Sequence, residues 1–482
     1  MDGSHHHDRK RDDNDATCAS HHERNDVHSR LNPTRHRRIE RPRDAPQIAD
    51  LLHRAQRQGA SVAVAGARHA MGGQQFLGDG WLIDTAALTG ILGFDRERGL
   101  VRVAAGTQWP QLQAFLRMQR DPQGRGWAIR QKQTGADDFS LGGALASNIH
   151  GRGLDFAPFV DDIDAFTLVR PDGEIVQVDR AREPELFALA VGGYGLFGVV
   201  ADLTLRLTPR RMLERRVGLL RRAELIAAFD AARDAGAQYG DFQFSIDPND
   251  RDFLDLGVFA CYHPLPDDTP ATAEPLHLGA EDWRALLLLA HTDKREAFRR
   301  YSRFYLDSHG QRYGSDDHQF GVYLDGYHTE IDRALGHTGS EMITELYVPR
   351  PALDAFLGEV AEDCRRHAVD LIYGTVRLIR QDHETVLAWA REDWACVVLN
   401  LHVRHDAEGR QRLRADARRL IDRALGFGGS FYLTYHREAR ADQLLAAYPR
   451  LRDAMAAKHR LDPQCTLDSD WYRALRATLA AQ

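Results

Sequence analysis

Two glycine-rich segments, at residues 66–73 and 135–151, place the strongest constraint on what this chain can fold into. The first follows a short apolar run at 61–65, and the second mixes glycine with small side chains and single polar groups. Backbone N–H groups that lack bulky side chains converge readily on an anion, and small residues let the backbone lie along a flat ring. Either segment alone is compatible with a structural turn. Together they indicate a binding site for a large cofactor.

A third glycine cluster, at 193–198, matches the GxGxxG spacing of dinucleotide-binding loops. In those loops the glycines join a strand to a helix whose N-terminus faces the pyrophosphate. Here a helical pattern at 183–190 precedes the glycines, and an alternating strand pattern at 199–207 follows them. Because the order is reversed, we reject a Rossmann-type interpretation of this cluster.

Length and periodicity predict an α+β protein with more than one domain. The 482 residues exceed the usual size of a single core. Before Pro209, a plausible boundary, the patterns predict helices at 48–55, 109–118 and 183–190, strands at 61–65, 81–84, 100–104 and 199–207, and a hairpin at 165–178. After it, helices at 353–367 and 410–425 alternate with strands at 375–379 and 395–403.

The N-terminal segment 1–40 is predicted to be a disordered tail. It is crowded with His, Arg, Asp and Asn and has no apolar run of the kind found in signal peptides. Its histidines include His5, His6, His7, His21 and His22. They are able to bind a metal ion, but because they lack fixed spacing and hydrophobic support, a solvated tail is favoured.

Charge and cysteine usage exclude several classes of protein. The formal net charge is -7, and both signs are spread along the chain, which argues against a nucleic-acid partner. The five cysteines form no CxxC pair, so neither a zinc site nor a disulfide framework is indicated, and a reducing cytoplasm fits best. No apolar run approaches the ~20 residues that a membrane span requires.

Four features between residues 42 and 209 resemble, in their order, the FAD-binding domain of the vanillyl-alcohol oxidase and p-cresol methylhydroxylase superfamily, also called PCMH-type. They are VAVAGARHA at 62–70, LIDTAAL followed by VRVAAGTQW at 82–109, SLGGALASNIHG at 140–151, and GGYGLFGVVADLTLRLTP at 192–209. Within this superfamily the chain is most similar to the alditol oxidase and aldonolactone oxidase branch. The resemblance implies a two-lobed FAD-binding domain at 41–210, a substrate or cap domain with an antiparallel sheet at 211–430, and a segment at 431–482 that returns to the FAD domain.

The resemblance also implies which residues contact FAD. Those expected to wrap the pyrophosphate are Ala65, Gly66, Ala67, Arg68, His69, Ala70 and Met71. Those expected to line the flavin are Gly135, Ser140, Gly143, Ser147, Asn148, Ile149 and His150, and Val199 or Val200 is expected near the adenine.

His69 stands where many relatives bond histidine to the flavin 8α-methyl group, so a covalent link is expected. Such a bond raises the reduction potential of the flavin. The alternative is that His69 only hydrogen-bonds the loop. No cysteine lies between Cys18 and Cys261, which excludes the second, cysteinyl link of some relatives.

Candidate catalytic residues come from the second half of the chain. Hydride transfer needs a group that takes the hydroxyl proton and a cation or donor that fixes the developing alkoxide. Arg377 matches an arginine of the sugar-oxidase strand, while Thr375 replaces the glutamate that relatives often carry. The alternative for Arg377 is an ordinary surface position.

Three further residues are candidates for the base. The period of two places Val398, Asn400 and His402 on one side of a strand, so His402 is expected to face the flavin. Tyr435 or His436 stands where relatives carry a basic residue, often lysine. A structural role remains open for each histidine.

The resulting hypothesis is an FAD-dependent oxidase or dehydrogenase that oxidises a CH–OH group of a polyol, sugar or sugar lactone. Hydride would pass to flavin N5, and oxygen or another acceptor would reoxidise the flavin. Two alternatives stay open. One is a C=C reductase or a component that oxidises or epimerises a lipid-linked sugar, and the other is a flavin-binding module without activity.

Overall fold

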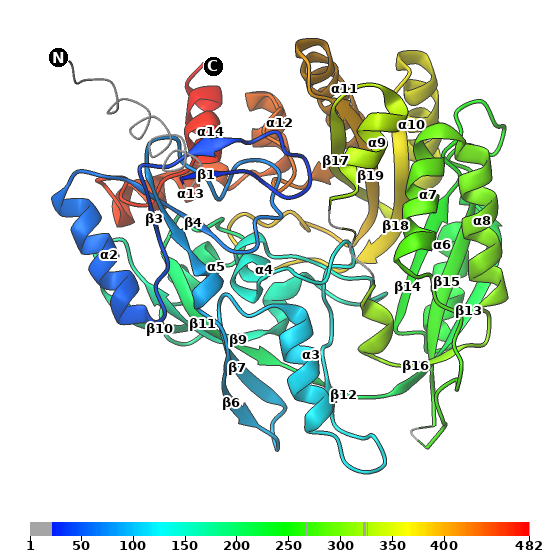
Figure 1. The fold of residues 1–482 in the computed structure, drawn as a ribbon, viewed down its shortest axis with the longest axis horizontal. Helices are drawn as coiled ribbons and strands as arrows, with labels where there is room; N and C mark the ends of the chain where they lie inside the picture. The colour runs from blue at the N-terminus through cyan, green and yellow to red at the C-terminus, as the bar shows by residue number, and fades with distance from the viewer. Residues whose placement is uncertain (1–21, 267, 322–323, 325, 482) are drawn as a thin grey trace, which may run out of the picture.

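The computed structural model of this chain describes residues 22–266, 268–321, 324 and 326–481. It confirms the α+β class: helices accompany several separate sheets, and the largest sheet is antiparallel (Figure 1). Up to Pro209 the described residues carry a three-stranded sheet, a five-stranded sheet and two two-stranded sheets. The two-stranded sheets pair β1 (Glu23–Arg24) with β2 (Thr34–Arg35), and β8 (Trp127–Ala128) with β12 (Thr208–Pro209). The large sheet begins at Met212. The division at residues 41, 211 and 431 stays a working hypothesis.

The three-stranded sheet is parallel and follows the β1–β2 pair. Its order is β3 (Arg38–Glu40), β5 (Trp81–Asp84) and β4 (Val62–Ala65). Helix α2 (Ala45–Arg57) precedes β4, and it begins where the Asp44 side chain accepts a hydrogen bond from a first-turn N–H. The apolar stripe predicted for this helix is buried.

The second small sheet is antiparallel and has five strands. Their order is β10 (Ile175–Asp179), β9 (Ile163–Val169), β11 (Val199–Arg206), β7 (Leu100–Ala104) and β6 (Ile91–Asp95). Helices α3 (Trp109–Met118), α4 (Leu141–Ser147) and α5 (Pro184–Ala190) belong to the same part of the chain. The predicted hairpin is confirmed, and Gly173 takes a φ of +87° in its turn. Because α5 precedes the glycines of 193–198 and β11 follows them, rejecting the Rossmann interpretation was correct.

The large sheet has eight strands, and every neighbouring pair is antiparallel. Its order is β16 (Arg312–Gly314), β13 (Met212–Arg221), β15 (Leu256–Leu265), β14 (Tyr239–Phe244), β18 (Leu371–Ile379), β19 (Trp394–Arg404), β17 (Gly339–Pro349) and β20 (Ser430–Phe431). Its helices are α6 (Leu225–Asp234), α7 (Ala280–Thr292), α8 (Lys294–Asp307), α9 (His328–Leu335), α10 (Leu353–His367) and α11 (Ala407–Gly426). In Figure 1 this sheet stands at the end of the molecule away from α2.

The chain ends in three helices, α12 (Ala441–Ala447), α13 (Leu451–Leu461) and α14 (Asp470–Ala480). Helix α12 packs on α11 and β20, while the segment between α13 and α14 returns to the three-stranded sheet. Leu467 forms a parallel bridge with Val62, and the Asp470 N–H donates to the Phe76 carbonyl. Both ends of the described chain therefore lie in the same region of the fold (Figure 1).

The prediction of a disordered tail at 1–40 was wrong for residues 22–40, because these residues are ordered. The Asp26 carboxylate accepts hydrogen bonds from the backbone and hydroxyl of Ser29, and the Asn32 amide donates to the Met71 carbonyl at 2.7 Å. All three of these N-terminal side chains are buried. A polar network thus orders a segment that has little apolar surface. The tail histidines at positions 5–7 and 21 lie outside the described residues.

None of the described helices is long and apolar enough to cross a bilayer. Cys261, Cys364, Cys396 and Cys465 carry free thiols. Cys18 lies outside the described residues.

Candidate functional site

A cavity of about 980 Å³ lies between the glycine-rich segments and the eight-stranded sheet. Segments 66–71, 133–150 and 194–200 contribute to one wall, and strands β14, β17, β18 and β19 contribute to the other. Helices α7 and α8 extend the second wall. This volume lies at the upper end of the range of about 300–1,000 Å³ typical of ligand sites, so the cavity has room for a large molecule.

Fourteen of the sixteen residues expected to contact FAD line this cavity. They are Gly66, Ala67, Arg68, His69, Ala70, Met71, Gly135, Ser140, Gly143, Ser147, Ile149, His150, Val199 and Val200. Ala65 and Asn148 lie behind the wall. The carbonyl of Ala65 accepts from the Thr85 hydroxyl, while Asn148 takes a φ of +47° at the end of α4 and bonds the Val160 N–H and Asp382. Their side chains or carbonyls support the wall rather than face its interior.

The two glycine-rich segments meet at Gly66 and Ser140. A Cβ at Gly66 would lie 2.0 Å from the Ser140 hydroxyl oxygen, so a side chain here would displace the serine hydroxyl from its present position. The turn continues at Arg68, which has a φ of +64°. The loop is then fixed to the C-terminal segment, because the N–H groups of Met71 and Gly72 both donate to the Thr434 carbonyl.

His69 lines the cavity and contacts groups through both ring nitrogens. Its Nδ1 lies 2.8 Å from Nε2 of His28, and its Nε2 lies 3.1 Å from a carboxylate oxygen of Asp138. The ring also packs 4.1 Å from that of Phe139. A covalent bond at either nitrogen would replace one of the two polar contacts.

Arg377 lies in the cavity and is only 8% exposed, so the alternative of an ordinary surface arginine was wrong. Its Nη2 donates to the Thr134 hydroxyl at 2.6 Å. Its Nε has no hydrogen-bond partner among the described residues. Thr375, two positions earlier, is fully buried and donates to the Phe242 carbonyl instead.

Lys132, which sequence reasoning missed, holds the loop that carries Thr134. It is fully buried, and its ammonium group donates to the carbonyls of Gln133 and Gln319 at 2.7 and 3.0 Å. It also lies 2.8 Å from the Asp137 carboxylate. Burial lowers the pKa of Lys132. The lysine therefore positions the partner of Arg377 without lining the cavity itself.

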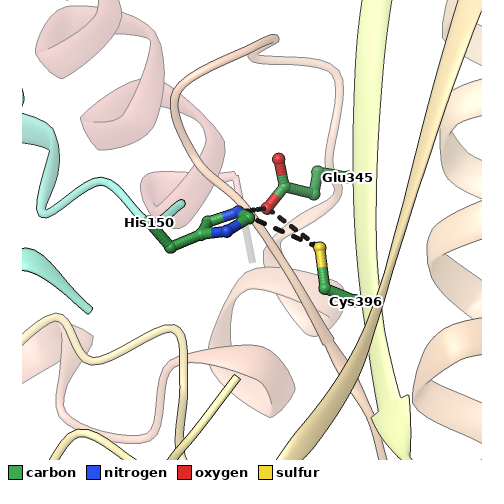
Figure 2. Close-up of side chains that lie close together, drawn as sticks. All are labelled: His150, Glu345 and Cys396. Atoms are coloured by element: carbon green, nitrogen blue, oxygen red, sulfur yellow. Dashed lines mark hydrogen bonds and ion pairs between the residues drawn. The ribbon is translucent and has the colours of Figure 1, made fainter. Parts of the chain in front are cut away.

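Glu345 is an acidic residue of the cavity that sequence reasoning also missed. It stands on β17 and lines the cavity. Figure 2 shows His150 and Cys396 converging on its Oε1, at 2.5 Å from the His150 Nε2 and 3.4 Å from the sulfur. The Tyr347 hydroxyl donates to the same oxygen at 2.5 Å. The carboxylate that Thr375 lacks is thus supplied by a different strand.

The hydrogen bonds of His150 show how this group handles a proton. Its Nδ1 lies 2.9 Å from the Gly151 carbonyl, which only accepts, so Nδ1 carries a hydrogen. The pair therefore has one further position for a proton, between His150 Nε2 and Glu345. Burial raises the pKa of Glu345, but His150, Tyr347 and Arg377 outweigh it and bring that pKa below its usual value. The carboxylate form of Glu345 is therefore favoured.

Cys396 completes the group as a neutral thiol. Burial, followed by the charge of Glu345, raises the pKa of Cys396 well above its usual value. Metal ions bind the thiolate rather than the thiol. Although the three side chains are close enough to hold an ion, their protonation favours a hydrogen-bonded cluster.

The three candidate bases have different surroundings. Tyr435 lines the cavity, but burial and Glu345 raise its pKa well above the usual value, which makes it a poor base. His402 does not line the cavity, because β19 runs past the cavity after Asn400 and His402 contacts Glu341 instead. His436 is also outside the cavity, and it is buried against Phe431. The expectation that His402 faces the flavin was wrong.

Several cavity-lining polar atoms have no partner among the described residues. Besides Arg377 Nε, they include Gln75 Oε1, Gln243 Oε1, Asn400 Oδ1, Arg152 Nε and His318 Nε2. Buried polar groups normally have a hydrogen-bond partner. These atoms therefore indicate where bound molecules are contacted. The period of two placed Asn400 on this side correctly, whereas no local pattern marks Gln75 or Gln243.

Comparison with known proteins identifies one segment of the chain. Residues 37–179 match the FAD binding domain family. This segment is a PCMH-type FAD-binding domain, and FAD is its cofactor. The cradle at Gly66 and the unpartnered polar atoms of the cavity fit such a group.

The chain is also similar to curated sugar-lactone enzymes. It is 28% identical over 176 residues to a D-arabinono-1,4-lactone oxidase of Eremothecium gossypii, which covers 35% of this chain and 31% of the relative. It is 27% identical over 206 residues to an L-gulono-1,4-lactone dehydrogenase of Mycobacterium tuberculosis, with 43% and 46% covered. An L-gulonolactone oxidase of mouse is 26% identical over 170 residues, with 35% and 37% covered. The matches span less than half the length of each of these relatives.

Proposed function

We propose that this protein is an FAD-dependent oxidoreductase that oxidises a CH–OH group of a sugar lactone, sugar or polyol. One observation carries the proposal: Arg377 and the His150–Glu345 pair lie in the same cavity as the glycine-rich segments of the FAD-binding domain. The similar proteins are lactone oxidases and dehydrogenases, which supports the same substrate class.

When bound, FAD supplies flavin N5, the atom that accepts hydride from the substrate carbon. The residues proposed to hold it are the fourteen of the earlier prediction that line the cavity. Because Gly66 and Gly143 have no side chain, the backbone there can closely approach a flat ring and a pyrophosphate. Residues outside the cavity, such as Asn148, would act by fixing the wall.

Arg377 is proposed to orient the hydroxyl-bearing carbon. Its Nη2 is engaged by Thr134, while its Nε is buried without a partner among the described residues. A substrate oxygen near this guanidinium would gain a charge-assisted hydrogen bond as negative charge develops on it. Asn400, with an unpartnered amide oxygen on the neighbouring strand, would accept from a second substrate hydroxyl.

Glu345 and His150 are proposed to remove the hydroxyl proton. The carboxylate is buried yet favoured in its charged form, and His150 lies against it at 2.5 Å. Such a pair accepts one proton without leaving an unpaired buried charge. This assignment replaces His402 and His436 as candidate bases.

Three finer features are also proposed. A covalent link through His69 is supported by its place on the cavity wall. Oxygen or another acceptor would reoxidise the flavin. A reducing compartment such as the cytoplasm is supported by the free thiols of Cys261, Cys364, Cys396 and Cys465, although similar plant proteins are mitochondrial.

The test is anaerobic reduction of the bound flavin by aldonolactones, free sugars and polyols. Flavin bleaching by at least one such donor is expected in the wild type. Arg377→Ala should slow bleaching by about 100-fold or more with flavin content unchanged, because one fixed donor to the developing charge is lost. Arg380→Ala, on an exposed arginine three positions later, is the matched control. Equal rates in Arg377→Ala and the wild type would remove the role of Arg377.

A second candidate is oxidation of a polar head group that carries an apolar chain. The observation that favours it is the apolar end of the cavity, where α7 and α8 contribute Trp283, Leu286, Leu287, Phe298 and Phe304. The leucines of α7 are only partly buried, so they are available for a ligand.

Alkyl glycosides distinguish the two candidates. If an apolar chain is bound, kcat/KM should exceed that of the free sugar, and Leu287→Gln should lower it by roughly 10- to 100-fold for the alkylated donor alone. Equal kcat/KM for both donors would favour the small polar substrate.

A further inference from the structure

A second group of titratable side chains lies beside the cavity and outside the proposed catalytic site. It consists of His291 in the last turn of α7, Glu341 on β17 and His402 on β19. One ligand atom from each lies within 4.8 Å of the others. None of the three lines the cavity, so the group is separate from Arg377 and Glu345.

Sheet register brings two members of the group together. Glu341 and His402 are directly opposite in the antiparallel pairing of β17 with β19, so their side chains share a face. His402 Nδ1 lies 3.6 Å from Glu341 Oε1. Helix α7 adds the third member, with His291 Nε2 at 3.1 Å from the same oxygen.

The atoms that face one another are buried and unsatisfied. Side-chain exposure is 0% for His291, 5% for Glu341 and 4% for His402. Among the described residues, His291 Nε2, Glu341 Oε1 and His402 Nδ1 have no hydrogen-bond partner of acceptable geometry. Three converging polar atoms without partners are costly in a protein interior unless something else satisfies them.

The surrounding contacts prepare these atoms as ligands. The Tyr327 hydroxyl donates to the other carboxylate oxygen of Glu341. His337 Nε2 lies 2.9 Å from His402 Nε2, and the tautomer in which His402 donates from Nε2 has its lone pair on Nδ1, facing Glu341. Gly339 makes room for the ring, because a Cβ at this position would lie 2.5 Å from His402 Cε1.

We propose that His291, Glu341 and His402 bind a divalent transition-metal ion of the zinc type. Tetrahedral zinc with bonds of about 2.0–2.2 Å holds its ligand atoms about 3.3 Å apart, between the 3.1 and 3.6 Å found here. Two imidazoles and a carboxylate suit zinc and its first-row neighbours better than magnesium or calcium, which prefer oxygen alone.

The ion would fasten α7 to the large sheet. His291 follows Ala290, which lines the cavity together with Leu286 and Leu287 of the same helix. Tyr327 links the two sites directly, since it lines the cavity and contacts Glu341. The metal thus fixes the apolar wall without touching the reacting atoms.

The first test counts metal in the full-length, flavin-loaded protein after removal of metal with a chelator, addition of zinc and gel filtration. The wild type is expected to retain one more zinc per chain than Glu341→Gln or His402→Gln. His263→Gln, which changes a buried histidine on β15, should retain as much as the wild type. The N-terminal histidines are present in every sample and cancel in the difference. Equal zinc content in the wild type and both ligand variants would overturn the proposal.

Two measurements on the wild type keep the proposal testable if a variant fails to fold. Zinc X-ray absorption should show two imidazoles and a carboxylate, and a first shell without imidazole would contradict the site. Zinc should also slow amide hydrogen exchange at the end of α7, and exchange that is unchanged by zinc would exclude a fastening role.

Discussion

At the scale of single residues, Glu345 is the least replaceable polar group of the proposed catalytic site. Three polar side chains converge on one of its oxygens, and its carboxylate form is favoured despite burial. We predict that Glu345→Gln slows flavin reduction by at least about 100-fold, because the amide cannot take a proton. Rapid-mixing spectrophotometry of the reductive half-reaction measures this rate. Glu359→Gln, on the exposed side of α10, is the control and should react as the wild type.

Replacing His436 is predicted to change stability and not flavin reduction, because this residue lies outside the cavity. Burial lowers its pKa to about 4. Between the unfolded value of about 6.5 and the folded value, the unfolded chain binds the proton and the folded chain does not, so this residue's stabilising contribution is lost as pH falls through that window.

Replacement by Phe should remove this dependence. We expect His436→Phe to lose about 2 kcal/mol less stability than the wild type when pH falls from about 7 to about 5. Thermal unfolding at the two pH values measures the difference, and flavin reduction should be unchanged. A variant that folds but no longer reduces its flavin would restore His436 as a catalytic candidate.

His69 decides how the cofactor is held. If its imidazole bonds the flavin, acid precipitation of the wild type leaves the yellow colour in the pellet. His69→Ala should release the colour to the supernatant after reconstitution with FAD, whereas His53→Ala, an exposed histidine on α2, should not. A colourless wild-type pellet would show that His69 contacts the flavin without a covalent bond.

At the scale of elements, the segment before β3 supports the first glycine loop. Asn32 donates to the Met71 carbonyl at 2.7 Å and to Asp26 at 3.0 Å. We predict that Asn32→Ala lowers stability by about 1–3 kcal/mol, because two buried acceptors lose a donor. Weaker FAD retention should accompany the loss, as measured by thermal unfolding and by equilibrium dialysis. Asn249→Ala, at an exposed turn, is the control; equal FAD retention in both variants would contradict a supporting role for this segment.

Element positions were predictable from the sequence where a single segment carries its own pattern. Helix α3 and helix α10 have the bounds that their apolar spacing predicts. The ordered segment at 22–40 was not predictable in this way, because polar contacts with the distant Met71 hold it. Composition alone does not reveal such a network.

Strand pairing explains why the positions of Glu345 and His402 were not predictable from the sequence. Glu345 reaches the cavity because β19 joins β17 to β18, which aligns Glu345 with Val398 and Val398 with Thr375. His402 lies on the same side of β19 as Val398 and Asn400, as the period of two predicts, but those two residues line the cavity and His402 lies beyond its end. Register across distant segments sets both positions, and no local spacing encodes it.

At the scale of the whole molecule, the cavity wall is shared by the two halves of the chain. The FAD-binding segments form one side, and the eight-stranded sheet with α7 and α8 forms the other. A cofactor that touches both sides binds only the folded arrangement, and it therefore stabilises the protein by mass action. The substrate would occupy the rest of the cavity between its two sides.

The measurement that tests this account most directly is the visible spectrum of the purified protein, followed under anaerobic conditions as an aldonolactone is added. The account predicts an oxidised flavin spectrum that bleaches on addition of the donor and returns when an acceptor is supplied. A colourless protein that cannot be reconstituted with FAD would contradict it. A stable yellow protein that no lactone, sugar or polyol bleaches would leave the FAD site and contradict the proposed oxidation.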